Sequence, residues 1–258
     1  MSRIAGKLAL VTGSSAGIGA ATARRLARDG ADLLLWARRE ERLRALAGEI
    51  RDDAGVSVEV EAIDVRDRES VFETAGRAIA RGRVPDIIVN NAGLAAGLDP
   101  VQEGDPDDWD RMIDTNVKGL LFVTRAFLPA MIERDAGHIV NLGSIAGHQV
   151  YPKGNVYNAT KFAVRALTEG TNIDLLGTKL RVSSVSPGLV ETEFSLVRFD
   201  GDAERADRVY EGYDPLTGED IAEAIAFVVN APEHVNVTEM ILLATAQRSA
   251  HHVHKEDA

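Results

Sequence analysis

The sequence has no cysteine, few aromatic residues and no apolar run long enough to cross a membrane. Without cysteine there can be no disulfide framework, so we expect a reducing compartment and a cytoplasmic protein. A membrane-spanning helix needs about 20 consecutive apolar residues. The sequence therefore predicts no membrane partner.

Basic residues are fewer than acidic residues. Lys and Arg number 29 against 40 Asp and Glu, which gives a formal net charge of −11. Such a surface repels the phosphate backbone of nucleic acids and anionic lipid. We therefore expect a small-molecule ligand and no nucleic acid, and an anionic ligand would need a locally basic pocket.

The 258 residues, of which 45% are hydrophobic, suffice for one domain covering residues 1–258. Short apolar runs alternate with helical patterns along the chain. Strands are expected at Lys7–Thr12, Asp32–Ala37, Val56–Ile63, Ile87–Asn90, His138–Leu142, Leu180–Val185 and Glu239–Leu243. Helices are expected at Gly17–Asp29, Glu40–Arg51, Asp67–Ala80, Asp107–Ile132, Val156–Leu176 and Thr217–Val229. This order predicts an α/β fold, with a doubly wound parallel sheet of about seven strands and helices on both faces.

Two segments lack a clear helical or strand periodicity of hydrophobic residues. Residues 189–213 are interpreted as an inserted substrate lobe that acts as a lid. The polar tail after Ala244 carries three histidines, and we interpret it as a solvated terminus with no metal site.

A glycine-rich loop, Thr12–Gly19 (TGSSAGIG), joins the first strand to the first helix. Glycines there allow a tight turn, and the helix start offers free N–H groups and a positive dipole to a pyrophosphate. The loop predicts a Rossmann dinucleotide site with contacts from Gly13, Ser15, Ala16, Gly17 and Ile18. The alternative is a glycine turn that only packs.

The end of the second strand indicates which dinucleotide binds. An NAD site places a carboxylate there, whereas this chain has Arg38 and Arg39. Because an arginine fork matches a 2′-phosphate, we expect NADP(H), bound first by Arg38 and second by Arg39. The alternative is a solvated arginine pair. Asp64 and Val65 are also expected at the cofactor, where Asp64 could accept from the adenine amino group; the alternative is that Asp64 caps the next helix.

Tyr157 and Lys161 are four residues apart and so share a helix face. The ammonium of Lys161 would lower the tyrosine pKa, which is near 10 in free tyrosine. Ser144 follows the fifth strand, where its hydroxyl could polarise a carbonyl oxygen. This trio suits proton transfer to or from an alcohol oxygen.

Taken together, the motifs resemble the short-chain dehydrogenase/reductase family. They are TGSSAGIG, NNAG at Asn90–Gly93, Asn116, GS at Gly143–Ser144, YNATK at Tyr157–Lys161 and PG at Pro187–Gly188. The resemblance implies that Tyr157 is the acid and base, that Lys161 holds the ribose and that Ser144 positions the substrate. Asn116 would bend its helix and anchor a water of a proton relay.

The resemblance also implies further cofactor contacts and an assembly. The contacts would come from Asn91, Ala92, Gly93, Tyr157, Lys161, Pro187, Gly188, Val190 and Thr192. Relatives usually form homotetramers through two long helices, which here would be Asp107–Ile132 and Val156–Leu176.

Longer segments, among them MIDTNVKGL, GNVYNATKFAVR and PGLVETEFSLVRF, resemble the NADP-dependent 3-hydroxy acid dehydrogenase branch of that family. Its members oxidise serine and allo-threonine and reduce malonic semialdehyde, and a near relative reduces sulfoacetaldehyde. A carboxylate in a closed pocket needs a partner. Lys153 and Arg198 are the candidates, although either could be a solvated cation, and Gln149 and Tyr151 are expected to line the pocket.

Two alternatives stay open. The same chemistry could act on a neutral secondary alcohol or ketone, or on sulfoacetaldehyde. The chain could also be a catalytically silent NADP-binding sensor, although no member of the Ser144, Tyr157 and Lys161 trio is missing.

Overall fold

The computed structural model describes residues 2–256, so Met1, Asp257 and Ala258 of the predicted domain lie outside the described residues. Seven parallel strands form one sheet in the order β3-β2-β1-β4-β5-β6-β7. Their bounds are β1 Leu8–Thr12, β2 Asp32–Ala37, β3 Val58–Ala62, β4 Ile87–Asn90, β5 Gly137–Leu142, β6 Leu180–Pro187 and β7 Glu239–Leu242. The predicted α/β fold is confirmed.

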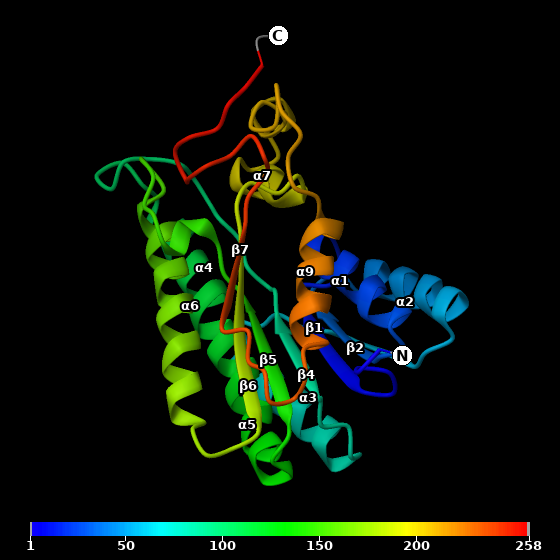
Figure 1. Ribbon diagram of the computed structural model, residues 1–258. Coiled ribbons are helices and arrows are strands. Elements are labelled where there is room, and N and C mark those ends of the chain that lie inside the picture. The colour runs from blue at the N-terminus through cyan, green and yellow to red at the C-terminus, as the bar shows by residue number, and fades with distance from the viewer. Residues whose placement is uncertain (1, 257–258) are drawn as a thin grey trace.

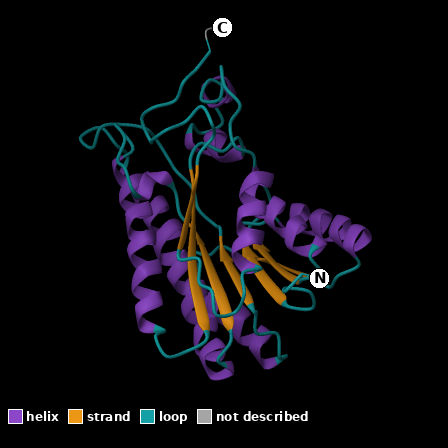
Figure 2. Ribbon diagram, viewed as in Figure 1, coloured by secondary structure: helices purple, strands orange, loops and turns teal. Residues whose placement is uncertain are grey.

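Helices cover both faces of the sheet (Figures 1 and 2). One layer is α1 Gly17–Arg28, α2 Glu40–Ala54 and α9 Gly218–Val229, and the other is α3 Arg68–Ala80, α4 Pro106–Ile113, α5 Leu120–Arg134 and α6 Asn155–Asp174. Central strands such as β1 are buried along their whole length, because both of their faces meet helices. Strand order reverses between β1 and β4, and ligands of such sheets bind at this point, beyond the carboxyl ends of the strands.

The helix predicted at 107–132 contains a wider turn. A π-helical turn, Asp114–Gly119, separates α4 from α5. Inside it, the buried Asn116 accepts a hydrogen bond from Leu94 N at 2.8 Å and donates to Leu94 O and to the Thr160 hydroxyl. The π-helical turn therefore directs the side chain of Asn116 toward the loop after β4. Such turns are frequently found at functional sites.

The segment 189–213 folds into two short helices, α7 Glu193–Arg198 and α8 Ala203–Asp207. Thr192 and Asp202 cap them with their side chains. The helices lie beyond the carboxyl ends of the strands, at the top of Figure 1. The segment therefore covers the end of the sheet where a ligand is expected.

The three histidines of the tail, His251, His252 and His254, are exposed, as the interpretation of a solvated terminus expects, but the described part of the tail also packs on the lobe. Glu256 N donates to Gly212 O at 2.7 Å, and Lys255 Nζ donates to Arg208 O at 2.9 Å. Gln247 is only 2% exposed. The tail packs on the lobe because these contacts satisfy polar groups that a free end would leave to water.

Thr217 caps α9. Its hydroxyl accepts from Asp220 N, and the Asp220 carboxylate accepts from Thr217 N at 2.8 Å, so the two residues form a capping box. We expect Thr217→Ala to lower the free energy of unfolding by about 1 kcal/mol, measured by urea denaturation. Thr217→Ser keeps the hydroxyl and should stay close to the wild type. Equal losses in both variants would show that the cap contributes nothing.

Candidate active site

One large cavity, about 490 Å³ in volume, opens at the carboxyl ends of the strands. It runs from the glycine loop past the ends of the central strands to the start of α6, beneath the lobe. Of the predicted site residues, the cavity is lined by Gly13, Ser15, Ala16, Gly17, Ile18, Arg38, Arg39, Asp64, Val65, Asn91, Ala92, Gly93, Ser144, Tyr151, Tyr157, Lys161, Pro187, Gly188, Val190, Thr192 and Arg198.

Three predicted site residues do not line this cavity. The side chain of Asn116 is turned to Leu94 and Thr160. Gln149 accepts a hydrogen bond from Ala250 N of the tail. Lys153 is exposed, has a positive φ of 64° and borders a separate small depression. Gln149 and Lys153, each two positions from Tyr151, therefore lie outside the cavity that Tyr151 lines.

The glycine loop has the shape that a dinucleotide needs. A Cβ on Gly19 would lie 2.5 Å from Gly13 O and from Asn91 Nδ2, so only glycine fits there. Helix α1 has no side-chain cap and no acidic residue in its first turn. Its first N–H groups are thus open to an anion, and they suit a pyrophosphate.

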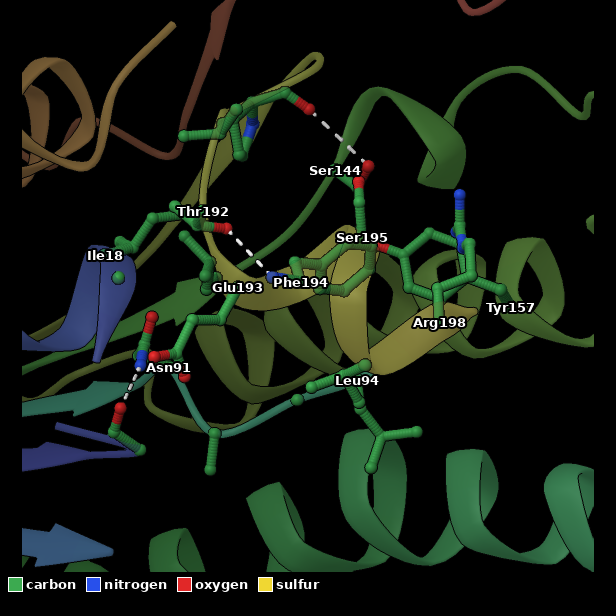
Figure 3. Close-up of a pocket in the computed structure, with 18 of the residues that line it drawn as sticks. Ile18, Asn91, Leu94, Ser144, Tyr157, Thr192, Glu193, Phe194, Ser195 and Arg198 are labelled. Carbon is green, nitrogen blue, oxygen red and sulfur yellow. Dashed lines mark hydrogen bonds between the residues drawn. The ribbon is translucent and has the colours of Figure 1, made fainter. Parts of the chain in front are cut away.

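Asn91 holds this loop against the sheet. Its side chain donates to Thr12 O at 2.8 Å and to Gly13 O at 3.3 Å, and both bonds span nearly 80 positions of sequence (Figure 3). The Thr12 hydroxyl in turn accepts from Asn91 N at 3.1 Å. The loop after β4 therefore fixes the form of the glycine loop.

The arginine pair lies at the far end of the cavity from Tyr157. Arg38 is exposed, and Arg39 donates to the Ser15 hydroxyl at 3.1 Å. Asp64 also lines this end. Burial by itself would raise the pKa of Asp64, but hydrogen bonds from Arg66 and the charge of Arg38 hold it below the ordinary value. Asp64 does not cap α3, because Asp67 does so.

Tyr157 lies in the first turn of α6, half buried beneath the lobe. Burial raises its pKa, and the neighbouring Tyr151 adds to the rise. Arg198 and a side-chain hydrogen bond to Ser144 act in the opposite direction. The phenol is therefore protonated at neutral pH in this structure and is ready to donate.

For Lys161, the lowering of the tyrosine pKa stays a prediction. Its ammonium donates to Leu142 O at 2.8 Å and lies 5.9 Å from the centre of the Tyr157 ring. Burial lowers its own pKa to about 8. The cation that opposes the rise in the tyrosine pKa is Arg198, from the lobe.

Ser144 caps a short helical turn after β5. Its hydroxyl oxygen accepts from Ala146 N at 3.1 Å and donates to Pro187 O at 3.4 Å, a long bond that is easily exchanged (Figure 3). The structure thus brings Ser144, Tyr157 and Lys161 together at the cavity wall.

Arg198, in the last turn of α7, completes this end of the cavity. Its Nη2 donates to the Tyr151 hydroxyl at 2.7 Å. Its guanidinium lies 5.1 Å from the centres of the Tyr157 and Phe194 rings. Its Nε is buried and has no partner among the described residues. A partly buried guanidinium with an unused donor suits an anion.

Sequence reasoning missed several residues of the cavity wall, among them Phe194, Gln247 and Ala250. Phe194 packs edge to face on Tyr157, with 5.6 Å between ring centres. Gln247 accepts from Leu189 N at 3.0 Å and fills the space that a side chain on Gly188 would need. A polar tail gives no periodic signal for such a contact, whereas the TEF segment, which begins with the predicted Thr192, could have drawn attention to Phe194.

Comparisons with known proteins agree with this geometry. The family model described as short chain dehydrogenase matches residues 7–201. The NADP-dependent 3-hydroxy acid dehydrogenase YdfG of Salmonella typhimurium is 46% identical over 94% of this chain and 97% of its own. Sulfoacetaldehyde reductase 2 of Chromohalobacter salexigens is 45% identical, over 93% and 95%.

A solved structure, the closed form of serine dehydrogenase complexed with NADP⁺, is 43% identical and has a TM-score of 0.89. It is matched over 96% of this chain and all of its own. The NADP named for YdfG and for the solved structure agrees with the arginine pair at the end of β2. The chain therefore belongs to the short-chain dehydrogenase family and is an oxidoreductase.

Proposed function

We propose that this protein is an NADP(H)-dependent oxidoreductase that interconverts a small 3-hydroxy acid and its semialdehyde. One observation carries the substrate class. The guanidinium of Arg198 lies beside Tyr157 in the cavity and keeps an unused buried donor. The names of the relatives, which include 3-hydroxy acid and serine dehydrogenases, support the same class.

A carboxylate in this cavity needs a cation, because an unpaired buried charge costs several kcal/mol. Among the described residues that line the cavity, four are cationic. Arg38 and Arg39 lie at the glycine-loop end, and Lys161 is engaged by Leu142 O. Arg198 is therefore the partner that we assign, and Lys153 is set aside because it lies outside the cavity.

The proposed chemistry divides between three side chains. Bound NADPH supplies the hydride. Tyr157, kept protonated by burial, donates its phenolic proton to the carbonyl oxygen, and Ser144 holds that oxygen with a hydrogen bond. In the oxidative direction Tyr157 must lose its proton, and the nearby charge of Arg198 favours that step. Lys161 is proposed to hold the ribose.

The lobe is proposed to act as a lid. Thr192, Phe194 and Arg198 all come from it and all line the cavity. Shutting out water strengthens the interaction between Arg198 and a substrate anion. We propose that Asn116 anchors a water of the proton relay that reaches Lys161.

Sulfoacetaldehyde is a second candidate, favoured by the Chromohalobacter relative. It too is anionic, so Arg198 serves both substrates. A neutral ketone would leave the charge of Arg198 without a role, and a silent sensor would leave the Ser144–Tyr157 pair without one. Neither is favoured by this geometry.

Initial rates with NADPH and NADH test the proposal. The panel contains malonic semialdehyde, sulfoacetaldehyde and neutral ketones, with serine and 3-hydroxypropionate in the oxidative direction. We expect NADPH and anionic carbonyls to give the highest kcat/KM. A neutral ketone as the best substrate would contradict the substrate class, and no turnover with any carbonyl would favour the sensor.

We also propose a cytoplasmic homotetramer. Helices α5 and α6 expose large apolar side chains, including Leu121, Ile132 and Phe162. Burying such side chains between subunits is favourable. Light scattering of the purified protein tests this, and a monomer at micromolar concentration would contradict it. No helix of the described residues is long and apolar enough to cross a membrane.

A further inference from the structure

Glu193, the first residue of α7, reaches from the lobe across the cavity to the start of α2. Its two carboxylate oxygens accept from different arginines, Arg39 Nη1 at 2.8 Å and Arg42 Nη1 at 2.6 Å. In Figure 3 it lies on the side of Ile18 and Asn91, away from Arg198 and Tyr157. Helix α7 of the lobe thus has an acidic contact through Glu193 at its first residue and a basic contact through Arg198 at its last.

The contact of Glu193 with Arg39 occupies one of the two arginines expected to hold the cofactor's 2′-phosphate. Arg39 lines the cavity and is joined to the glycine loop through Ser15. Its Nη1 is taken by Glu193. Arg38 makes no ion pair with any described residue. Half of the arginine pair is therefore already bound to a carboxylate of the protein itself.

We propose that Glu193 is a specificity-determining residue that competes with the 2′-phosphate of the cofactor for Arg39. A phosphate and a carboxylate are both anions that prefer the same arginine fork. Binding both at Arg39 brings like charges together. A cofactor with a free 2′-hydroxyl causes no such conflict, and its hydroxyl can donate to the carboxylate. Glu193 therefore narrows the preference for NADP over NAD.

The position of Glu193 in the lobe gives this competition a second consequence. Glu193 follows directly on Thr192, the cap of α7. A 2′-phosphate on Arg39 removes one of the two bonds that tie the start of α7 to α2. The phosphorylated cofactor thus loosens one end of the lobe as it binds, whereas the cofactor without the phosphate leaves the tie in place.

The charge state of Glu193 fits this role. Hydrogen bonds from Arg39 and Arg42 lower its pKa, so it is ionised at neutral pH. The three side chains are between 42% and 51% exposed, which lets a ligand reach them and leaves the contact weak enough to be displaced.

The test uses half-cofactors, so it does not depend on turnover, although it rests on the proposed use of NADP. Adenosine 2′,5′-bisphosphate and adenosine 3′,5′-bisphosphate carry the same charge and differ in the position of one phosphate. Each is titrated calorimetrically into the wild type and Glu193→Gln. The control is Glu191→Gln, an exposed carboxylate two residues earlier that makes no ion pair within residues 2–256.

We expect Glu193→Gln to bind the 2′,5′-bisphosphate about fivefold more tightly than the wild type. Binding of the 3′,5′-isomer should change less than twofold, as should both affinities in Glu191→Gln. Suppose that the wild type prefers the 2′,5′-isomer and that Glu193→Gln binds this isomer no more tightly than the wild type does. This result overturns the competition alone. A wild type that does not prefer the 2′,5′-isomer overturns both the competition and the use of NADP.

Discussion

Replacing Tyr157 with phenylalanine is expected to lower kcat at least about 100-fold, because a positioned general acid contributes that much or more. The ring would stay, and with it the edge-to-face packing on Phe194. Only the hydroxyl, which lies with Ser144 at the cavity wall, would be lost. Cofactor affinity and melting temperature should change little, so initial rates and an NADPH titration together isolate the proton transfer.

Tyr213→Phe is the matched control for this variant. Tyr213 is a phenol at the end of the lobe whose hydroxyl donates to Val209 O at 3.4 Å, and it does not line the cavity. Its removal should leave kcat within about twofold of the wild type. If Tyr157→Phe were as active as Tyr213→Phe, the proposed acid would be another group.

Replacing Arg198 with methionine should lower kcat/KM for malonic semialdehyde about 100-fold. The substrate carboxylate would lose its partner, and removing one member of a buried charge pair costs about 2–5 kcal/mol. The kcat/KM for a neutral ketone should fall far less. The ratio of the two is the proper readout, because Arg198 also opposes the rise in the Tyr157 pKa, and that effect applies to both substrates.

Arg205→Met provides the control for Arg198. Arg205 is an exposed arginine of the same lobe, stacked 4.3 Å from the centre of the Phe199 ring. The substitution removes the same charge from the lobe at a place outside the cavity. The ratio of kcat/KM for malonic semialdehyde to that for a neutral ketone should therefore stay as in the wild type. Equal losses for charged and neutral substrates in Arg198→Met would mean that this arginine supports the lobe and does not bind the substrate.

Much of the fold could be predicted because buried strands leave a strong local pattern. Asp32–Ala37 and Ile87–Asn90 were placed with their correct ends, since each is a short apolar run between turns. The cap at Thr217 was equally local. The apolar helical pattern does not predict the π turn around Asn116, because it does not say which carbonyl each N–H reaches, and only the family resemblance indicates a bend there.

The candidate site divides in the same way. The glycine loop and the Tyr157–Lys161 spacing are local, and both lie where the sequence placed them. Whether Lys153 points into the cavity depends on a left-handed backbone that the sequence did not reveal. The contact between Arg39 and Glu193 joins residues 154 positions apart, so only the folded chain brings it into view.

The most direct test of hydride transfer at this site uses NADPH with both hydrogens at C4 of the nicotinamide replaced by deuterium. The wild type is incubated with malonic semialdehyde in ordinary water, and the product is examined by NMR. We expect 3-hydroxypropionate with one deuterium at C3, formed in equal amount to NADP⁺. Unlabelled product, or bound NADPH that is never oxidised, would contradict the account.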